Sequence, residues 1–122
     1  MSRLDRRGAP RVARRVPVTI GHEHGALLAR TKDLSASGAY CTLRRFLPPM
    51  TKLEIQLNIA DGARPARITC HGIVVRVKPG KASPRISRYH TAIFFSDLTD
   101  TNRLTLARYV QRHLHAAPSP RD

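Results

Sequence analysis

The sequence has few acidic residues, few cysteines and no long apolar run. Only eight of its 122 residues are Asp or Glu, against 22 Lys and Arg, and the formal net charge is +14. No apolar stretch approaches the ~18 residues of a membrane span, and the N-terminus lacks the apolar core of a signal peptide. We therefore expect a cytoplasmic protein of bacterial type without a membrane span.

The sequence also lacks metal-binding patterns. Cys41 and Cys70 both lie in strand-like segments and form no CxxC motif, so we expect small buried thiols rather than a disulfide or a metal site. His22 and His24 flank Glu23 in a predicted turn, where a divalent ion could bind, but no further ligand set is evident. We predict no metal and no cofactor.

Catalytic motifs are missing as well. The acidic residues are scattered, and no Gly-rich phosphate loop precedes a helix. Ser35 and Ser37 are not surrounded by anything like G-x-S-x-G. We predict that the protein is not an enzyme and has no catalytic residues.

What the sequence has in abundance is arginine. Only four of the 22 basic residues are lysine, and an arginine excess suits phosphates and guanine edges. A generally basic surface, or a basic nucleic-acid-binding β-barrel, would produce the same excess. Charge alone leaves these alternatives open.

The pattern along the chain predicts a mainly all-β domain. Residues 1–15 form a basic arm with six arginines, in which Gly8 and Pro10 oppose a helix. Alternating or β-branched segments then predict six short strands, at 16–20, 26–31, 39–43, 52–60, 66–77 and 89–95, with Gly72 as a bulge or bend.

The C-terminal region predicts a helix. Leu106, Val110 and Leu114 recur at helical spacing beside Tyr109, behind Thr99 or Asp100 as caps. The expected fold is a six-stranded antiparallel β-barrel with a C-terminal α-helix, one domain over residues 16–115, a flexible arm and a disordered tail at 116–122.

Two features are unusual for such a domain. Arg7 and Arg11 bracket "GAP" on an arm that Pro10 keeps extended, and paired guanidiniums there could bind a phosphate or a guanine; the plainer alternative is a mobile basic tail. The connection "DLSASG", residues 33–38, spends six residues where a hairpin needs two. It begins with an acid and ends with a glycine.

Together, "RGAPR" followed by "DLSASG" in a small β-barrel resembles the PilZ domain family, over roughly residues 6–114. The resemblance implies a PilZ-type barrel that binds cyclic di-GMP. Carried over, Arg7 and Arg11 are the arm ligands, and Asp33, Ser35 and Gly38 form the loop. Arg6 and Arg76 are possible additional ligand residues.

The chemistry of these residue types agrees with that role. A carboxylate such as Asp33 can accept from guanine N1–H and N2–H, Ser35 can bond to a base or sugar edge, and Gly38 permits positive φ and close approach. The expected function is a stand-alone, non-enzymatic receptor with a downstream protein partner in trans. A PilZ-like interaction adaptor without ligand, or a nucleic-acid-binding barrel, is the alternative.

Overall fold

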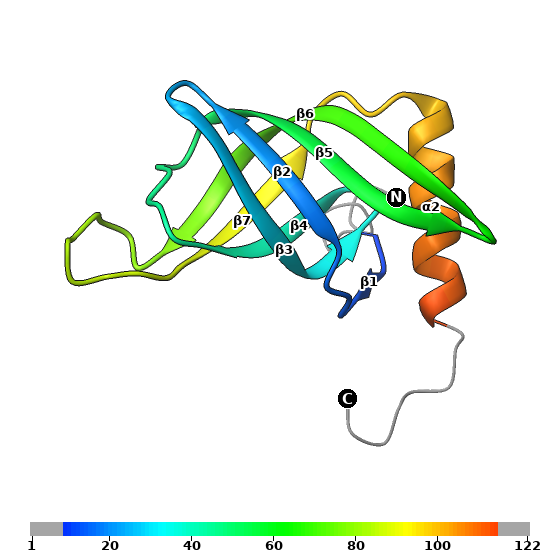
Figure 1. Cartoon of the computed structure of the whole chain (residues 1–122), viewed down its shortest axis with the longest axis horizontal. Helices are drawn as coiled ribbons and strands as arrows, with labels where there is room; N and C mark the ends of the chain where they lie inside the picture. The colour runs from blue at the N-terminus through cyan, green and yellow to red at the C-terminus, as the bar shows by residue number, and fades with distance from the viewer. Residues whose placement is uncertain (1–8, 115–122) are drawn as a thin grey trace, which may run out of the picture.

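The structure, a computed structural model, describes residues 9–114. Within that range seven β-strands are followed by one α-helix (Figure 1). The elements are β1 (Arg11–Val12), β2 (Pro17–His22), β3 (Gly25–Ser35), β4 (Gly38–Leu43), β5 (Lys52–Asp61), β6 (Arg64–Lys78), β7 (Tyr89–Phe95) and α2 (Asp100–Leu114).

Strands β2 to β7 form a closed antiparallel barrel. Their order is β3-β2-β5-β6-β7-β4, and pairing of β3 with β4 closes the sheet on itself. This confirms the predicted six-stranded barrel with a C-terminal helix. The short strand β1 lies outside the barrel order and pairs with the end of β3, in the part of the chain expected to be a free arm. Val12 is buried there.

The barrel interior is filled by alternate residues of the strands, because successive side chains point to opposite faces. In β5, the predicted apolar set is buried while its polar neighbours are exposed or half-buried: Leu53, Ile55, Leu57 and Ile59 face inward. Burying one such aliphatic side chain contributes about 1.5–3 kcal/mol. The two-residue period of this segment therefore predicts the strand and its face correctly.

Helix α2 packs beside β1 and the β5–β6 hairpin (Figure 1). Leu106, Tyr109 and Val110 are buried as predicted, but Leu114 is 40% exposed, because it lies in the last turn of the helix, at the edge of the packed surface. The Asn102 N–H donates to Thr99 Oγ1 (3.1 Å), so Thr99 is the N-cap. No helix within the described range is long and apolar enough to cross a membrane.

The strand pairing also tests the bulge or bend expected at Gly72. Gly72 lies in regular register with Leu53 and Phe95, so the prediction of a bulge there is wrong; the β6 bulge falls at Val75 instead. A Cβ on Gly72 would lie only 2.9 Å from Ile93 Cγ2, so the position is glycine because β7 packs closely against it.

Both cysteines are free thiols, as expected. Cys41 is buried, and burial, aided by the nearby Asp33 charge, raises its pKa to about 12. Cys70 is only half-buried, and burial followed by the charge of Asp97 raises its pKa to about 11. Both thiols therefore stay protonated at neutral pH and serve as small packing groups.

An ion pair joins the barrel to the segment that leads into α2. The backbone N–H of His71 donates to Asp97 Oδ1 (2.6 Å), and His71 Nδ1 lies 2.7 Å from Asp97 Oδ2. The carboxylate hydrogen bond raises the pKa of His71, and the backbone and ring hydrogen bonds from His71 lower the pKa of Asp97. The Ser96 N–H also donates to the His71 carbonyl (2.9 Å).

This pair predicts a pH dependence of stability. The His71 contribution is complete below the ordinary histidine value of 6.5 and is lost as pH rises through its raised pKa, whereas the Asp97 contribution is lost as pH falls below about 3.8. Urea unfolding at about pH 6 and about pH 8 should show the stability difference between wild type and His71→Gln shrinking at the higher pH. The exposed His24→Gln control should show no such change, and a His71 difference equal at both pH values would contradict the assignment.

Candidate functional site

The connection between β3 and β4 is a tight hairpin. Strand β3 continues to Ser35 and β4 begins at Gly38, so only Ala36 and Ser37 form the turn. The predicted six-residue loop is therefore wrong. Asp33 belongs to the strand and lies opposite Tyr40 of β4.

A β-bulge turns Asp33 to the outside of the barrel. The pairing between β3 and β4 shifts register between Thr31 and Asp33, which leaves Lys32 as the extra residue. In a regular strand Asp33 would share the inward face of the fully buried Thr31, because alternate residues share a face. The bulge reverses that alternation, so the carboxylate reaches the outer surface.

Ser35 shapes the turn. Its side chain is fully buried, and its Oγ accepts hydrogen bonds from the backbone N–H groups of Ser37 (3.1 Å) and Gly38 (3.2 Å). A buried hydroxyl occupied in this way fixes the backbone of the hairpin. The Ser37 hydroxyl lies 3.1 Å from the Ser35 hydroxyl.

Gly38 is needed for close packing rather than for positive φ. Its φ is not in the left-handed region, so that expectation is wrong. A Cβ at this position would lie 2.3 Å from the carbonyl oxygen of Ile93 on β7. The Phe95 N–H donates to the Ser37 carbonyl (2.9 Å), which holds the turn against the same strand.

Strand β1 brings an arm arginine to this hairpin. Arg11 lies opposite Ser35 and Val12 opposite Leu34, and the Arg11 guanidinium forms an ion pair with the Asp33 carboxylate. The Arg11 side chain is 46% exposed and that of Asp33 is 32% exposed. The structure thus brings together the arm and the hairpin, which are far apart in the sequence. Arg6 and Arg7 lie outside the described residues.

Arg76 lies on the same outer surface as Asp33. A row of cross-strand partners runs from Asp33 through Tyr40 and Ala92 to Arg76, and we call it the Asp33 row. The second bulge, at Val75, turns Arg76 outward just as the first turns Asp33 outward. Three strand spacings separate the ends of the row, about 14 Å.

Sequence reasoning missed an aromatic part of this surface. The Tyr40 and His90 rings are nearly parallel, with centroids 6.4 Å apart and an interplanar angle of 18°. Lys32 Nζ lies 5.8 Å from the centre of the Tyr40 ring. The alternation in "AYCTL" could have indicated that Tyr40 faces outward, since its neighbour Cys41 was expected to be buried. The surface therefore offers a carboxylate, guanidiniums and aromatic faces, which suits a planar, anionic ligand.

Comparison with known proteins identifies the family of this domain. The family model described as "PilZ domain" matches residues 5–112. A search of curated proteins finds no match. Among solved structures, the chain resembles the inhibitor of motility MotI/DgrA of Bacillus subtilis with a TM-score of 0.77 at 17% identity, over 91% of this chain. The chain spans 52% of that protein's length.

Two isolated PilZ domains are also similar in fold. The PilZ domain of CeSA from a cellulose-synthesizing bacterium matches with a TM-score of 0.58 at 18% identity, over 86% of this chain and 98% of that one. The PilZ domain of YcgR from Escherichia coli, solved with c-di-GMP, matches with a TM-score of 0.61 at 14% identity, over 85% and 88% of the two chains.

The packing at Gly38 gives a first prediction for this site. Gly38→Ala should destabilise the domain by about 1–3 kcal/mol, because the added Cβ meets a backbone carbonyl that cannot move aside alone. Gly21→Ala is the matched control, since its Cβ would meet nothing closer than 3.4 Å. Urea unfolding measures both variants, and equal stabilities would contradict the close approach.

Ser35 gives a second prediction. Ser35→Ala should cost about 1–3 kcal/mol of folding stability, because two backbone N–H groups of the turn lose their buried acceptor. Ser37→Ala, which removes a hydroxyl at the turn itself, should cost markedly less. Amide hydrogen exchange should quicken at Ser37 and Gly38 in the Ser35 variant, and unchanged exchange there would show that Ser35 does not hold the turn.

Proposed function

The chain belongs to the PilZ domain family, and on that premise we propose that it is a non-enzymatic receptor for cyclic di-GMP. PilZ domains are a family of cyclic di-GMP receptors and are generally non-catalytic. In this proposal the ligand lies against the hairpin between β3 and β4, held by Arg7 and Arg11 from the arm side and by Asp33 from the hairpin side.

The observation that carries the proposal is the contact between Arg11 and Asp33. These two motif residues meet through the pairing of β1 with β3, on a surface where both side chains remain partly exposed. An exposed ion pair of this kind contributes about 0–1 kcal/mol, so an incoming ligand can replace it at low cost. The pair is thus suited to exchange one partner for a ligand.

The two charges have complementary uses once they separate. The Asp33 carboxylate can accept hydrogen bonds from the N1–H and N2–H groups of a guanine. The Arg11 guanidinium can then bind a phosphate or the guanine O6 and N7 atoms, which the carboxylate cannot do. Arg7 and Arg6, four and five residues before Arg11, would supply further cation on the arm side.

The other residues of this surface have different roles in the proposal. Ser35 and Gly38 set the backbone of the hairpin through the buried hydroxyl and the close approach to β7, and so hold Asp33 in place. Tyr40 offers a ring face next to Asp33 for stacking against a base. Arg76 lies at the far end of the Asp33 row and in this proposal would contact a second negative group of an extended ligand.

A partner protein would recognise the ligand-bound form of the domain. Because β1 is only two residues long, a ligand bridging Arg11 and Asp33 would stabilise its pairing with β3. That ordering would change the surface that the arm and hairpin present to a protein partner in trans.

Isothermal titration calorimetry with cyclic di-GMP tests this function. Wild type should release or absorb heat on binding, and Arg7→Ala, Arg11→Ala or Asp33→Ala should weaken binding about tenfold or more, because each removes a charge-assisted hydrogen bond. Arg67→Ala, an exposed arginine on β6 outside the Asp33 row, is the control and should bind like wild type. No heat from wild type at high micromolar ligand would contradict the proposal.

The same variants distinguish cyclic di-GMP binding from the nucleic-acid-binding alternative. A basic nucleic-acid-binding barrel would bind an oligonucleotide with an affinity that falls steeply with salt, and removing Asp33 would leave that affinity unchanged or raise it. Loss of cyclic di-GMP binding in Asp33→Ala would instead identify a carboxylate that accepts from the ligand.

A further inference from the structure

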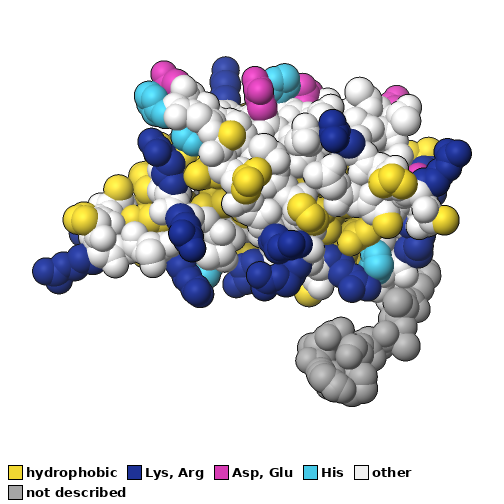
Figure 2. All heavy atoms as spheres, in the orientation of Figure 1, with side chains coloured by type: hydrophobic (Ala, Val, Ile, Leu, Met, Phe, Trp, Pro, Cys, Tyr) yellow, Lys and Arg dark blue, Asp and Glu magenta, His cyan; other side chains and the backbone are white. Residues whose placement is uncertain are grey.

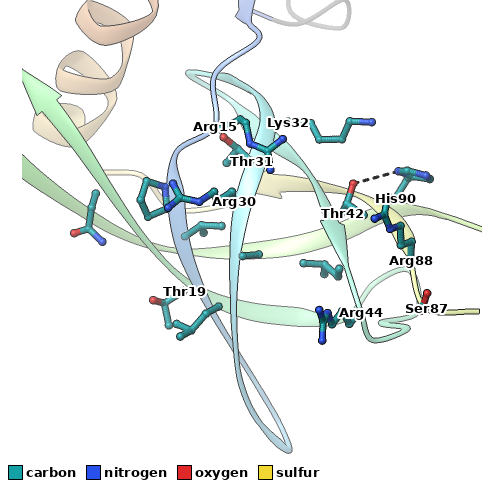
Figure 3. Close-up of a pocket in the computed structure, with 16 residues that line it drawn as sticks. Arg15, Thr19, Arg30, Thr31, Lys32, Thr42, Arg44, Ser87, Arg88 and His90 are labelled. Carbon is teal, nitrogen blue, oxygen red and sulfur yellow. Dashed lines mark hydrogen bonds between the residues drawn. The ribbon is translucent and has the colours of Figure 1, made fainter.

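The β3–β4 pairing that closes the barrel does not extend to the first half of β3. Residues Gly25–Arg30 pair with β2 on one edge only, because β3 meets β4 from Thr31 onward. Where β3 and β4 separate, a cleft of about 1030 Å³ lies between β3 and the ends of β4 and β7 (Figure 3). The cleft therefore follows from the point at which β3 and β4 stop pairing.

The cleft is strongly basic. Among the residues that the structure describes, its lining contains five exposed Lys and Arg side chains and no Asp or Glu: Arg15, Arg30, Lys32, Arg44 and Arg88. Among the described residues none of these five forms an ion pair, since the arginine pairs found there involve only Arg11, Arg108 and Arg112. Figure 2 shows Lys and Arg gathered along the lower edge of the molecule and acidic side chains mainly along the upper edge.

One wall of the cleft carries an unusual apolar residue. Leu28, on β3, lines the cleft and is 84% exposed. Its neighbours along the same face are charged or small. An exposed leucine among cations suits a partner that presents both negative charge and apolar side chains.

The cleft borders the proposed ligand surface and shares Lys32 and His90 with it, but the motif residues lie outside it. None of Arg11, Asp33, Ser35 or Gly38 lines it. The two regions are also linked where the chain after Arg15 meets β3. The Val16 N–H donates to Thr31 Oγ1 (2.9 Å), and the Thr31 N–H donates to the Val16 carbonyl (3.0 Å). These bonds hold the chain just after Arg15 against β3, so the segment that carries Arg11 to Asp33 also carries Arg15 to the cleft.

From these features we propose that the cleft binds an acidic segment of a partner protein that also carries aliphatic side chains. Five cations that form no ion pair within residues 9–114 supply electrostatic attraction, and Leu28 supplies an apolar contact. Single-stranded nucleic acid is a poorer match, because it stacks its bases on aromatic platforms and the cleft contains no Trp, Tyr or Phe, only His90. The inference rests on the proposed function in that a receptor acting in trans needs such a partner surface.

Fluorescence anisotropy with synthetic peptides tests the cleft in the absence of cyclic di-GMP. The first probe is a labelled peptide of the repeat Glu-Glu-Leu, the second replaces each Leu by Ser, and the third is oligo-dT of equal charge. The triple variant Arg30→Glu/Arg44→Glu/Arg88→Glu should bind the Glu-Glu-Leu peptide at least about tenfold more weakly than wild type. Leu28→Ser should lose the preference for the Leu peptide over the Ser peptide.

The control variant Arg64→Glu/Arg67→Glu/Arg103→Glu has the same net charge and changes exposed arginines outside the cleft. It should bind within about threefold of wild type, since distant exposed charges are screened. Equal losses in both triple variants would overturn the inference in favour of diffuse attraction. Tighter, cleft-dependent binding of oligo-dT would overturn it in favour of nucleic acid, and no peptide binding by wild type would overturn it outright.

Folding and ligand binding are checked separately. Circular dichroism should show that both triple variants keep the wild-type β-sheet spectrum, because all six side chains are exposed; if the cleft variant unfolds, the single change Arg44→Glu replaces it, with about threefold weaker binding expected. Arg11→Ala and Asp33→Ala should retain peptide binding. Failure of the peptide test therefore leaves the cyclic di-GMP proposal standing, and the reverse holds as well.

Discussion

Strand β3 divides its backbone hydrogen bonds among three partners, and the features that matter for function follow from that division. Its first half pairs with β2, its last residues pair with β1 on one edge, and from Thr31 onward it pairs with β4 on the other. A strand of eleven residues is long enough to serve all three. The part with two neighbours carries the candidate ligand site, and the part with one neighbour borders the basic cleft.

Two bulges give the outer surface its chemistry. A sheet with perfect alternation would turn Asp33 and Arg76 toward the apolar interior, where a lone charge costs far more free energy than the strand can recover. The extra residues Lys32 and Val75 reverse the alternation at the right points. A carboxylate and a guanidinium therefore end the same cross-strand row, and Arg11 reaches that carboxylate from β1.

Local patterns predicted much of this fold. The run "YHTAIFF" gives β7 with its bounds, and the alternation of β5 gives its buried face, because both signals depend on side-chain period within one strand. The hairpin at Ser35 was not predictable in that way. Its tight turn depends on a buried hydroxyl and on contact with Ile93, which is distant in sequence, and the same holds for the bulges.

The candidate site was likewise predictable only in part. The motif spacing indicated four residues: Arg11, Asp33, Ser35 and Gly38. The ion pair between Arg11 and Asp33 becomes visible only through the pairing of β1 with β3. Burial then distinguishes Ser35 and Gly38, which shape the hairpin, from the partly exposed Asp33. The cleft could not be foreseen, because its cations come from separate strands and the arm. The composition predicts the excess of positive charge, but the strand pairing determines which basic side chains lie together in the cleft.

The most direct measurement of the central claim is an NMR titration of the ¹⁵N-labelled protein with cyclic di-GMP. The account predicts that the largest amide shifts fall at the Arg11–Val12 strand, at Asp33 to Tyr40 and at Ala92, with small changes at Leu28 and Arg44 in the cleft. Shifts concentrated at Leu28 and Arg44, with Asp33 and Arg11 unmoved, would contradict it, and so would the absence of shifts at saturating ligand.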